Sequence, residues 1–238
     1  MITPIAFLPL GDSAVLIHFG EEINLSVHRQ VHAACRYIDE HPFPGFIESI
    51  PSFTTVSVYY DLLEIQKTKE CSTVFDDVCM LIQDRLNKIE LQEEQNPVVI
   101  EIPVCYGGEF GPDLETVASL NNLTPKQVIE VHSGQDYLIY ALGFAPGFPY
   151  VGGISEQIAA PRKTTPRLKI SAGSIGIAGN QTGIYPIETP GGWQIIGRTP
   201  LTLFRPEHQP PTLLEGGQYI RFKQISEAEY DLLEGGAV

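Results

Sequence analysis

The first ninety residues alternate between the two spacings of apolar side chains that distinguish strands from helices. Short apolar or β-branched runs, typical of strands, occur at 6–8, 14–19, 46–50 and 54–60. Leu25–Glu40 repeats its apolar residues at helical spacing, and a second helical face runs from about Ser72 to Ile89. The order β-β-α-β-β-α predicts a small two-layer α/β domain over residues 1–92.

The pattern changes after the polar stretch 91–97, which ends in proline and is typical of a linker. Val98–Cys105 has the composition of a strand. Two short helices are expected next, one from Asp113 and one that starts at Pro125 behind a Thr124 cap with Gln127 completing a capping box. From Tyr137 onward, short strand-like runs are broken by Gly and Pro until a final helix at 227–233. This half, residues 98–238, is predicted to be a β-barrel or sandwich.

Composition and charge exclude several classes of protein. Only 18% of the 238 residues are charged, against roughly 25% in an average domain, and the chain contains 22 Gly and 19 Pro, which favours turn-rich β structure. A formal net charge of −14 argues against a nucleic-acid partner. The first twenty residues lack Lys and Arg, so we expect a cytoplasmic protein without a secretory signal. The uncharged run Tyr137–Ser155 is long enough for a membrane span, but its Gly and Pro argue against one.

Residues that could ligate a metal or act as a nucleophile are present but isolated. His28 and His32 stand four apart, yet no HExxH glutamate or third ligand accompanies them. The four cysteines form no CxxC pair and indicate neither a disulfide framework nor a zinc site: Cys35, Cys71, Cys79 and Cys105. Cys105 is more typical of a buried, inert thiol than of a nucleophile. We therefore expect no metal site.

Standard phosphate-binding and serine-hydrolase motifs are missing from the sequence. The run Gly173–Gly179 imitates a phosphate-binding loop, but the β-branched residues between its glycines favour a strand. No Walker A sequence and no GxSxG elbow occur. If ATP is used, this chain therefore has no standard cradle for it.

Two Gly- and Pro-rich stretches and a group of cations are the main candidates for a functional site. The stretches ALGFAPGFPYVGG (141–153) and GIYPIETPGGWQIIGRT (183–199) allow close backbone approach in rigid loops. Between 157 and 205 lie six of the 15 basic residues and one acid, Glu188; the six are Arg162, Lys163, Arg167, Lys169, Arg198 and Arg205. Arginine binds carboxylate or phosphate bidentately, so this group could hold an anionic substrate. Alternatively, these are solvated loop cations, and the glycines only turn barrel corners.

His132 is the candidate proton carrier, because it ends the second short helix, close in sequence to the first of these stretches. A lone histidine is, however, more often structural.

The chain resembles the KipI / allophanate hydrolase subunit 1 family, which is associated with the B subunit of bacterial 5-oxoprolinase. The resemblance covers nearly the whole chain and is carried by Pro9–Ala14, Glu101–Leu114, His132, Leu142–Tyr150, Pro161-Arg162, Pro166-Arg167, Gly183–Pro186 and Thr189–Pro200. It implies an α+β protein of two domains, with a small N-terminal two-layer α/β domain followed by a cyclophilin-like β-barrel.

The resemblance also implies an activity. The B subunit would open 5-oxoproline to glutamate together with the C and A subunits of 5-oxoprolinase, with ATP used by the complex, and would be inactive alone. In this interpretation Arg162 or Arg167 holds the substrate carboxylate or a transferred phosphate, and His132 moves a proton. The other residues expected to bind substrate or partner are Lys169, Gly143, Phe144, Pro146, Gly147, Phe148, Tyr150, Pro190, Gly191, Gly192, Trp193 and Arg198.

Two other interpretations remain open at this point. Some family members are described as inhibitors of a sporulation kinase, so the chain could bind a sensor histidine kinase without chemistry of its own, with Phe144, Phe148, Tyr150 and Trp193 as anchors. Prolyl isomerase activity would follow only from the cyclophilin-like fold, and a fold does not imply a function. Which member of the complex supplies the catalytic base also stays open.

Overall fold

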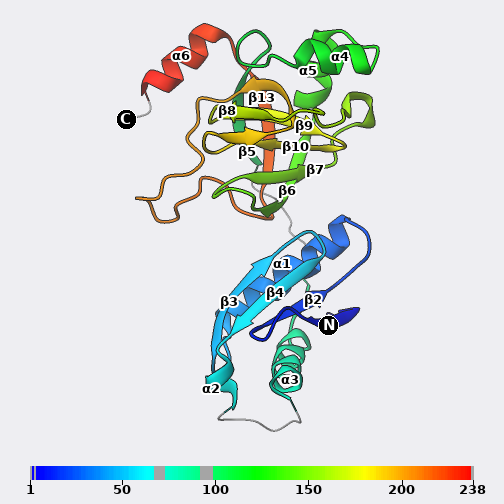
Figure 1. Cartoon of the computed structure of the whole chain (residues 1–238), viewed down its shortest axis with the longest axis vertical. Helices are drawn as coiled ribbons and strands as arrows, with labels where there is room; N and C mark the ends of the chain where they lie inside the picture. Colours follow the sequence, from blue (N-terminus) through cyan, green and yellow to red (C-terminus); the bar gives the residue numbers. More distant parts are fainter. Residues whose placement is uncertain (1, 3, 67–72, 92–98, 237–238) are drawn as a thin grey trace. The chain divides into compact units, whose positions relative to one another are not determined.

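The computed structural model describes residues 2, 4–66, 73–91 and 99–236 and divides the chain into two compact units, 1–95 and 96–238 (Figure 1). Each unit has its own apolar core. The predicted linker 91–97, apart from Leu91, and Cys71 lie outside the described residues.

The N-terminal unit is a four-stranded antiparallel sheet in the order β1-β2-β4-β3, with helices packed on it. Its elements are β1 (Ala6–Pro9), β2 (Ala14–His18), α1 (Leu25–Glu40), β3 (Phe46–Pro51), β4 (Thr55–Tyr60), α2 (Leu62–Gln66) and α3 (Val74–Leu86). Asn24 caps α1 by accepting from Val27 N–H at 3.0 Å, so the helix begins where its apolar spacing begins. The α/β arrangement expected for this half is confirmed, and α2 is the element that the sequence pattern did not predict.

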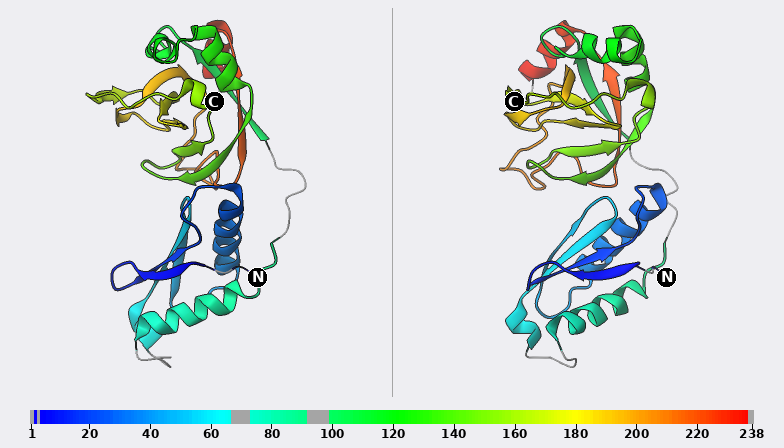
Figure 2. Two further views of the ribbon diagram at one scale, coloured as in Figure 1. Left: turned by 90° about the vertical axis from the view of Figure 1, so that its right-hand side faces the viewer. Right: turned by 45° about the vertical axis from the view of Figure 1, so that its right-hand side comes forward.

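The C-terminal unit is a closed barrel of seven strands in the order β10-β7-β6-β13-β5-β12-β9 (Figures 1 and 2). The strands are β5 (Val99–Tyr106), β6 (Asp136–Leu142), β7 (Pro149–Gly152), β9 (Ser174–Ala178), β10 (Gln181–Ile184), β12 (Gln194–Arg198) and β13 (Tyr219–Gln224). β13 pairs with β5 in parallel, and the other neighbouring barrel strands pair antiparallel. Buried β-branched and aliphatic side chains such as Ile102, Ile139 and Ile177 fill the interior. The predicted α+β fold with a C-terminal barrel is confirmed.

Helices and a two-stranded ribbon surround the barrel. They are α4 (Leu114–Leu120), α5 (Pro125–Ser133), the 3₁₀ turn η1 (Glu156–Ile158), α6 (Glu227–Gly236), and the ribbon of β8 (Arg167–Ile170) with β11 (Thr189–Gly191). The predicted capping box of α5 is present: Gln127 N–H donates to Thr124 Oγ1 at 3.3 Å, and Thr124 N–H donates to Gln127 Oε1 at 2.8 Å. The ribbon matters most for function, because it carries Arg167 on one strand and Gly191 on the other.

The uncharged run Tyr137–Ser155 forms β6, β7 and the loop between them. In the described part of the chain, the structure has no helix with the length and apolar character needed to cross a membrane.

Candidate anion-binding site

Asp113 joins three segments of the barrel unit that are far apart in the sequence. It precedes α4, and its side chain is only 4% exposed. Oδ1 accepts from Arg167 Nη2 at 2.7 Å and from Lys163 Nζ at 3.1 Å, while Oδ2 accepts from the backbone N–H of Ile195 at 2.7 Å. Burial by itself raises the pKa of Asp113, but the hydrogen bonds from Arg167, Ile195 and Lys163 outweigh it and lower the pKa overall. The carboxylate therefore stays ionised and fixes both cations.

Arg167 is hydrogen-bonded to Asp113 through Nη2, whereas its Nη1 donates no hydrogen bond to a described residue. The side chain as a whole is 27% exposed, although the Nη1 atom itself is buried. An unpaired buried donor is costly, and an anion that accepts from this guanidinium would relieve that cost.

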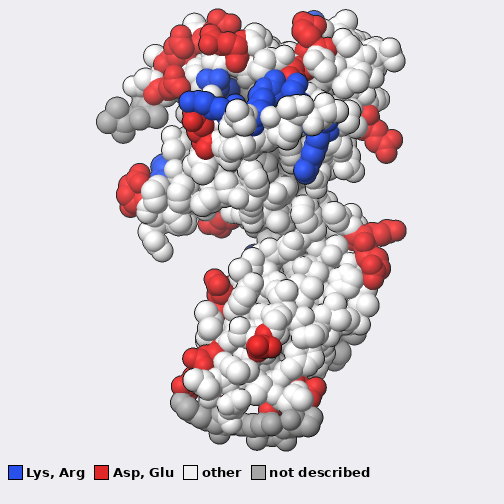
Figure 3. All heavy atoms as spheres, in the orientation of Figure 1, with Lys and Arg blue, Asp and Glu red and all other residues white. Residues whose placement is uncertain are grey.

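Arg162 adds a second guanidinium near Arg167, and the charges of both arginines act on the neutral phenol of Tyr185. Arg162 is exposed. Burial raises the pKa of Tyr185 to about 12, while the backbone N–H of Trp193 and the charges of Arg162 and Arg167 oppose that rise. Both arginines thus act on the same phenol. Figure 3 shows Lys and Arg side chains gathered over the part of the barrel unit where β8 and β9 lie.

The two Gly- and Pro-rich stretches meet in one aromatic cluster. Phe148 from the first lies 5.2 Å from Tyr185 and 5.6 Å from Trp193 of the second, measured between ring centroids. Phe148 and Trp193 are buried, with 1% and 6% of their surface exposed, and Tyr150 packs beside them. Phe144 differs: it is 62% exposed and has a φ of +64°. The stretches therefore form a structural wall, with Phe144 as its exposed aromatic ring.

Glycines in these stretches allow close backbone approach, as the sequence suggests. A Cβ on Gly191 would lie 2.5 Å from the Tyr185 hydroxyl, so only glycine fits at this point of β11. The carbonyl of Gly192 accepts from Lys163 N–H at 2.7 Å, which ties the second stretch to the cation-bearing loop. Pro190, the residue before Gly191, is exposed.

The loop between β6 and β7 borders a shallow hollow of about 330 Å³. Its lining consists of Leu142, Gly143, Phe144, Ala145, Pro146, Gly147 and Thr212. None of these side chains is charged, so the hollow suits an apolar group rather than an anion.

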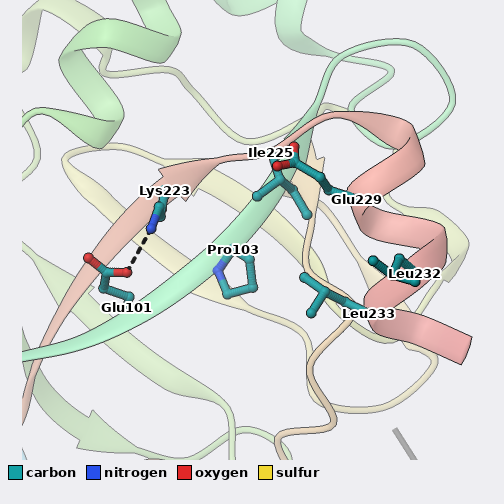
Figure 4. Close-up of a pocket in the computed structure, with 7 residues that line it drawn as sticks. All are labelled: Glu101, Pro103, Lys223, Ile225, Glu229, Leu232 and Leu233. Atoms are coloured by element: carbon teal, nitrogen blue, oxygen red, sulfur yellow. Dashed lines mark hydrogen bonds and ion pairs between the residues drawn. The ribbon is translucent and has the colours of Figure 1, made fainter. Parts of the chain in front are cut away.

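A second hollow, of about 350 Å³, lies between α6 and the strands β5 and β13 (Figure 4). It is lined by Glu101, Pro103, Lys223, Ile225, Glu229, Leu232 and Leu233 and shares no residue with the Asp113 and Arg167 group. Lys223 already pairs with Glu101 at 3.1 Å, and Leu232 is 77% exposed. This hollow has no uncompensated cation in its lining and is a poorer candidate for an anionic substrate.

Two predicted binding cations lie elsewhere or are already paired. Lys169 Nζ forms an exposed ion pair with Glu188 Oε2 at 2.7 Å. The Arg198 guanidinium lies 5.5 Å from the centre of the Phe110 ring and interacts with Tyr230 of α6. These contacts direct the Arg198 side chain toward Phe110 and α6, and its binding role stays a prediction.

The predicted proton-carrying role of His132 is also corrected. Its side chain is fully buried, with Nδ1 2.8 Å from the Tyr106 hydroxyl, Nε2 3.1 Å from Thr182 Oγ1, and the ring stacked on Phe222. Burial lowers the pKa of His132 from 6.5 to about 3. A neutral histidine sealed in the barrel interior cannot exchange a proton with a substrate at neutral pH. It serves to satisfy buried hydroxyl groups.

Burial of His132 predicts a pH-dependent loss of stability. Its folded-state pKa is depressed, so the unfolded state binds more protons between pH 6.5 and 3, and stability falls as the pH drops through that window. Relative to His132→Gln, the wild-type barrel unit should lose about 2 kcal/mol between pH 7 and pH 5. Urea unfolding followed by fluorescence of Trp193, the single tryptophan, measures this.

The matched control is His208→Gln, which removes an exposed histidine of the same unit. It should keep the wild-type difference between the two pH values. If His132→Gln kept that difference as well, the buried neutral state of His132 would be refuted.

The isolated candidates for metal binding or nucleophilic attack gain no support. The His28 and His32 rings lie 4.2 Å apart, and burial, with smaller contributions from His32 and Arg29, lowers the pKa of His28 to about 3. Across the described ranges, no group of three or more His, Cys, Asp or Glu side chains could hold a metal ion. Cys105 is buried, and burial raises the pKa of its thiol, as expected for an inert cysteine.

The glycine-rich run 173–179 does not fit a nucleotide phosphate. Ser174–Ala178 forms the buried strand β9, and a Cβ on Gly173 would collide with the carbonyl oxygen of Thr199. The run is therefore a buried barrel strand with a close backbone approach at Gly173, and it does not form a glycine-rich loop ahead of a helix. No ATP-dependent step is assigned to this run.

Sequence reasoning missed Asp113 and Tyr185 as site residues. The sequence indicated only that a short helix starts from Asp113, and Tyr185 lay within the second Gly- and Pro-rich stretch. No local signal marks Asp113, because it is one of several acids between residues 101 and 136, and its role follows only once the fold brings residues 113 and 167 together.

Comparison with known proteins places these features in a family. The carboxyltransferase domain family, subdomains C and D, matches residues 5–214. The B subunit of 5-oxoprolinase from Bacillus subtilis (strain 168) is 57% identical over 223 residues, 93% of each chain. The protein of that name from Escherichia coli O157:H7 is 40% identical over 214 residues, 90% of this chain and 93% of its own. The crystal structure of TTHA0988 matches with a TM-score of 0.77 and 30% identity over 90% of this chain, which spans only 40% of that longer chain.

Proposed function

The chain belongs to the carboxyltransferase domain family of subdomains C and D, within the group of 5-oxoprolinase B subunits, and from this premise we propose that it is the B component of an ATP-dependent enzyme that opens 5-oxoproline to glutamate. The observation that supports this most directly is the 57% identity over 93% of both chains. The charged group around Arg167 agrees with it, because 5-oxoproline carries a carboxylate.

The proposed role of this chain is to bind and orient the anionic end of the substrate. Arg167, fixed by Asp113, and the exposed Arg162 would receive the carboxylate or a transferred phosphate. The buried wall of Phe148 and Trp193 would keep water from one side of the site, which strengthens the electrostatic attraction. ATP activates the amide in the assembled enzyme, and no residue of this chain is assigned to that step.

The chemistry of the site favours an enzyme that is complete only as a complex. Asp113 uses both carboxylate oxygens on Arg167, Lys163 and the Ile195 N–H, and its lowered pKa makes it a weak base. Tyr185 keeps its proton at neutral pH because its pKa is raised to about 12. His132 is sealed in the core. The general base would therefore come from a partner, either the A or the C subunit, and the chain alone would be inactive.

Reconstitution tests this proposal. Release of glutamate from 5-oxoproline would be measured with this chain, the A and C subunits and ATP, and again with each component left out. We expect activity only in the complete mixture, because the anion-binding residues and the base lie on different chains. Undiminished turnover by the partners without this chain would contradict the proposal.

The alternative of a sensor histidine kinase inhibitor is not favoured. The relatives that match at least nine-tenths of this chain at 40% identity or better are named as oxoprolinase subunits. The aromatic residues expected to dock on a kinase are also mostly buried; only Phe144 of the group is largely exposed.

A further inference from the structure

Tyr185 is fixed at the end of β10, with 1% of its surface exposed and its phenol within the electrostatic influence of Arg162 and Arg167. It follows β10 directly, and its backbone is held on both sides: Tyr185 N–H donates to Ser174 O at 2.8 Å, and Gly173 N–H donates to Tyr185 O at 2.7 Å. Its ring packs on Phe148 and lies within the buried cluster. The phenol therefore has little freedom to move, which is the condition for a specific hydrogen bond.

The ribbon of β8 and β11 brings the Tyr185 hydroxyl close to the strand position that pairs with Arg167. Gly191 stands opposite Arg167 in the ladder between the two strands. The same glycine passes so close to the hydroxyl that a Cβ on it would lie 2.5 Å away. The hydroxyl thus lies beside the backbone position that pairs with Arg167, and the charges of Arg162 and Arg167 oppose the rise in the pKa of the phenol.

The Tyr185 hydroxyl is able to donate a hydrogen bond to a ligand. The backbone N–H of Trp193 is near enough to oppose the rise in the pKa of this phenol, and among the described residues no side-chain hydrogen bond is donated by its O–H. Because burial raises the pKa to about 12, the phenol stays protonated throughout the physiological range. It can donate a hydrogen bond but cannot act as a base.

The charged side chains near Tyr185 carry a net positive charge, which favours binding of an anion. Arg162, Lys163 and Arg167 supply three positive charges, and Asp113, the carboxylate bonded to two of them, supplies one negative charge. The group has an excess of two positive charges in a protein whose net charge is −14. An anion that accepts from a guanidinium and from a phenol at once is best matched by a planar carboxylate.

We infer that the Tyr185 hydroxyl donates a hydrogen bond to the substrate carboxylate that Arg167 holds, so that Tyr185 is a residue of substrate binding and specificity. This inference rests on the proposed function, because that function supplies the carboxylate-bearing lactam. Tyr185 selects lactams that carry a carboxylate over those that lack one, and it has no part in proton transfer.

The test uses the assembled enzyme with Tyr185→Phe and two substrates, 5-oxoproline and 2-pyrrolidone, which is the same lactam without the carboxylate. A hydrogen bond to a charged group is lost only with 5-oxoproline. KM for 5-oxoproline should rise roughly 10- to 100-fold with kcat within a factor of about three. The preference for 5-oxoproline over 2-pyrrolidone, as a ratio of kcat/KM, should fall by the same factor.

Tyr140→Phe is the matched control, since it removes a phenol hydroxyl from β6, where the ring packs on Gly152. It should leave KM and the substrate ratio at their wild-type values. An unchanged ratio in Tyr185→Phe, or an equal loss of kcat with both substrates, would overturn the inference while the function stands. A wild-type complex without 5-oxoprolinase activity would instead overturn the proposed function, so the two failures are distinguishable.

Discussion

Replacement of Asp113 by alanine is expected to lower the free energy of unfolding of the barrel unit by about 3–5 kcal/mol. Asp113 is almost fully buried and is the common partner of Arg167, Lys163 and the Ile195 N–H. Its removal leaves two partly buried cations to repel each other and a buried backbone donor without an acceptor. Urea denaturation followed by Trp193 fluorescence would measure the change at pH 7.

Asp136→Ala is the appropriate control, because Asp136 also binds an arginine, Arg221, but at the surface. Such a pair contributes about 0–1 kcal/mol, so the control variant should stay close to wild type. The stabilisation by Asp113 has a defined pH dependence. Its folded-state pKa is lowered, so the contribution is present above the unfolded value of about 3.9 and is lost as the pH falls through the folded value. Equal losses in the two variants at pH 7 would show that Asp113 is not the anchor described above.

Replacement of Arg167 by alanine is expected to reduce kcat/KM for 5-oxoproline in the complete enzyme by about 10²- to 10³-fold. The guanidinium is the group fixed by Asp113, and its Nη1 has no partner among the described residues. Arg167→Lys should recover little, since a single ammonium cannot hold Asp113 and a planar carboxylate in the same geometry. Steady-state kinetics of the reconstituted enzyme would measure both variants.

Lys126→Ala provides the comparison for loss of a positive charge alone. Lys126 lies on α5, is 86% exposed and pairs only loosely with Glu130 at 3.7 Å. It should retain wild-type kinetics. Full activity in Arg167→Ala would remove the basis for an anion-binding site in this chain, whereas intact folding with lost activity would support it.

Local structure in this protein follows from local sequence. The capping box of Thr124 and Gln127 and the apolar spacing of Leu25–Glu40 each involve residues within a few turns, and both helices occur where the sequence predicts them. The short strands with glycine turns and the resemblance over the whole chain predicted the α+β fold with a barrel, and the structure confirms it.

Individual side-chain roles depended on contacts that no local pattern contains. An aspartate before a helix is ordinarily its cap, yet Asp113 makes no side-chain cap hydrogen bond and instead binds the distant cations Lys163 and Arg167. His132 has the chemistry of a proton carrier, but the barrel closes over it and removes both solvent and its charge.

The sequence by itself determined most of the elements, although not α2, together with the family and the region that holds the cations, because helix periodicity, capping and motif order are properties of neighbouring residues. Only the tertiary structure decided which cation is anchored, which histidine is buried and which tyrosine lies within the electrostatic influence of Arg162 and Arg167. Burial and long-range pairing set the charge state and the accessibility of a side chain. Both quantities arise when distant segments pack together, as residues 113, 167, 185 and 191 do at the edge of this barrel.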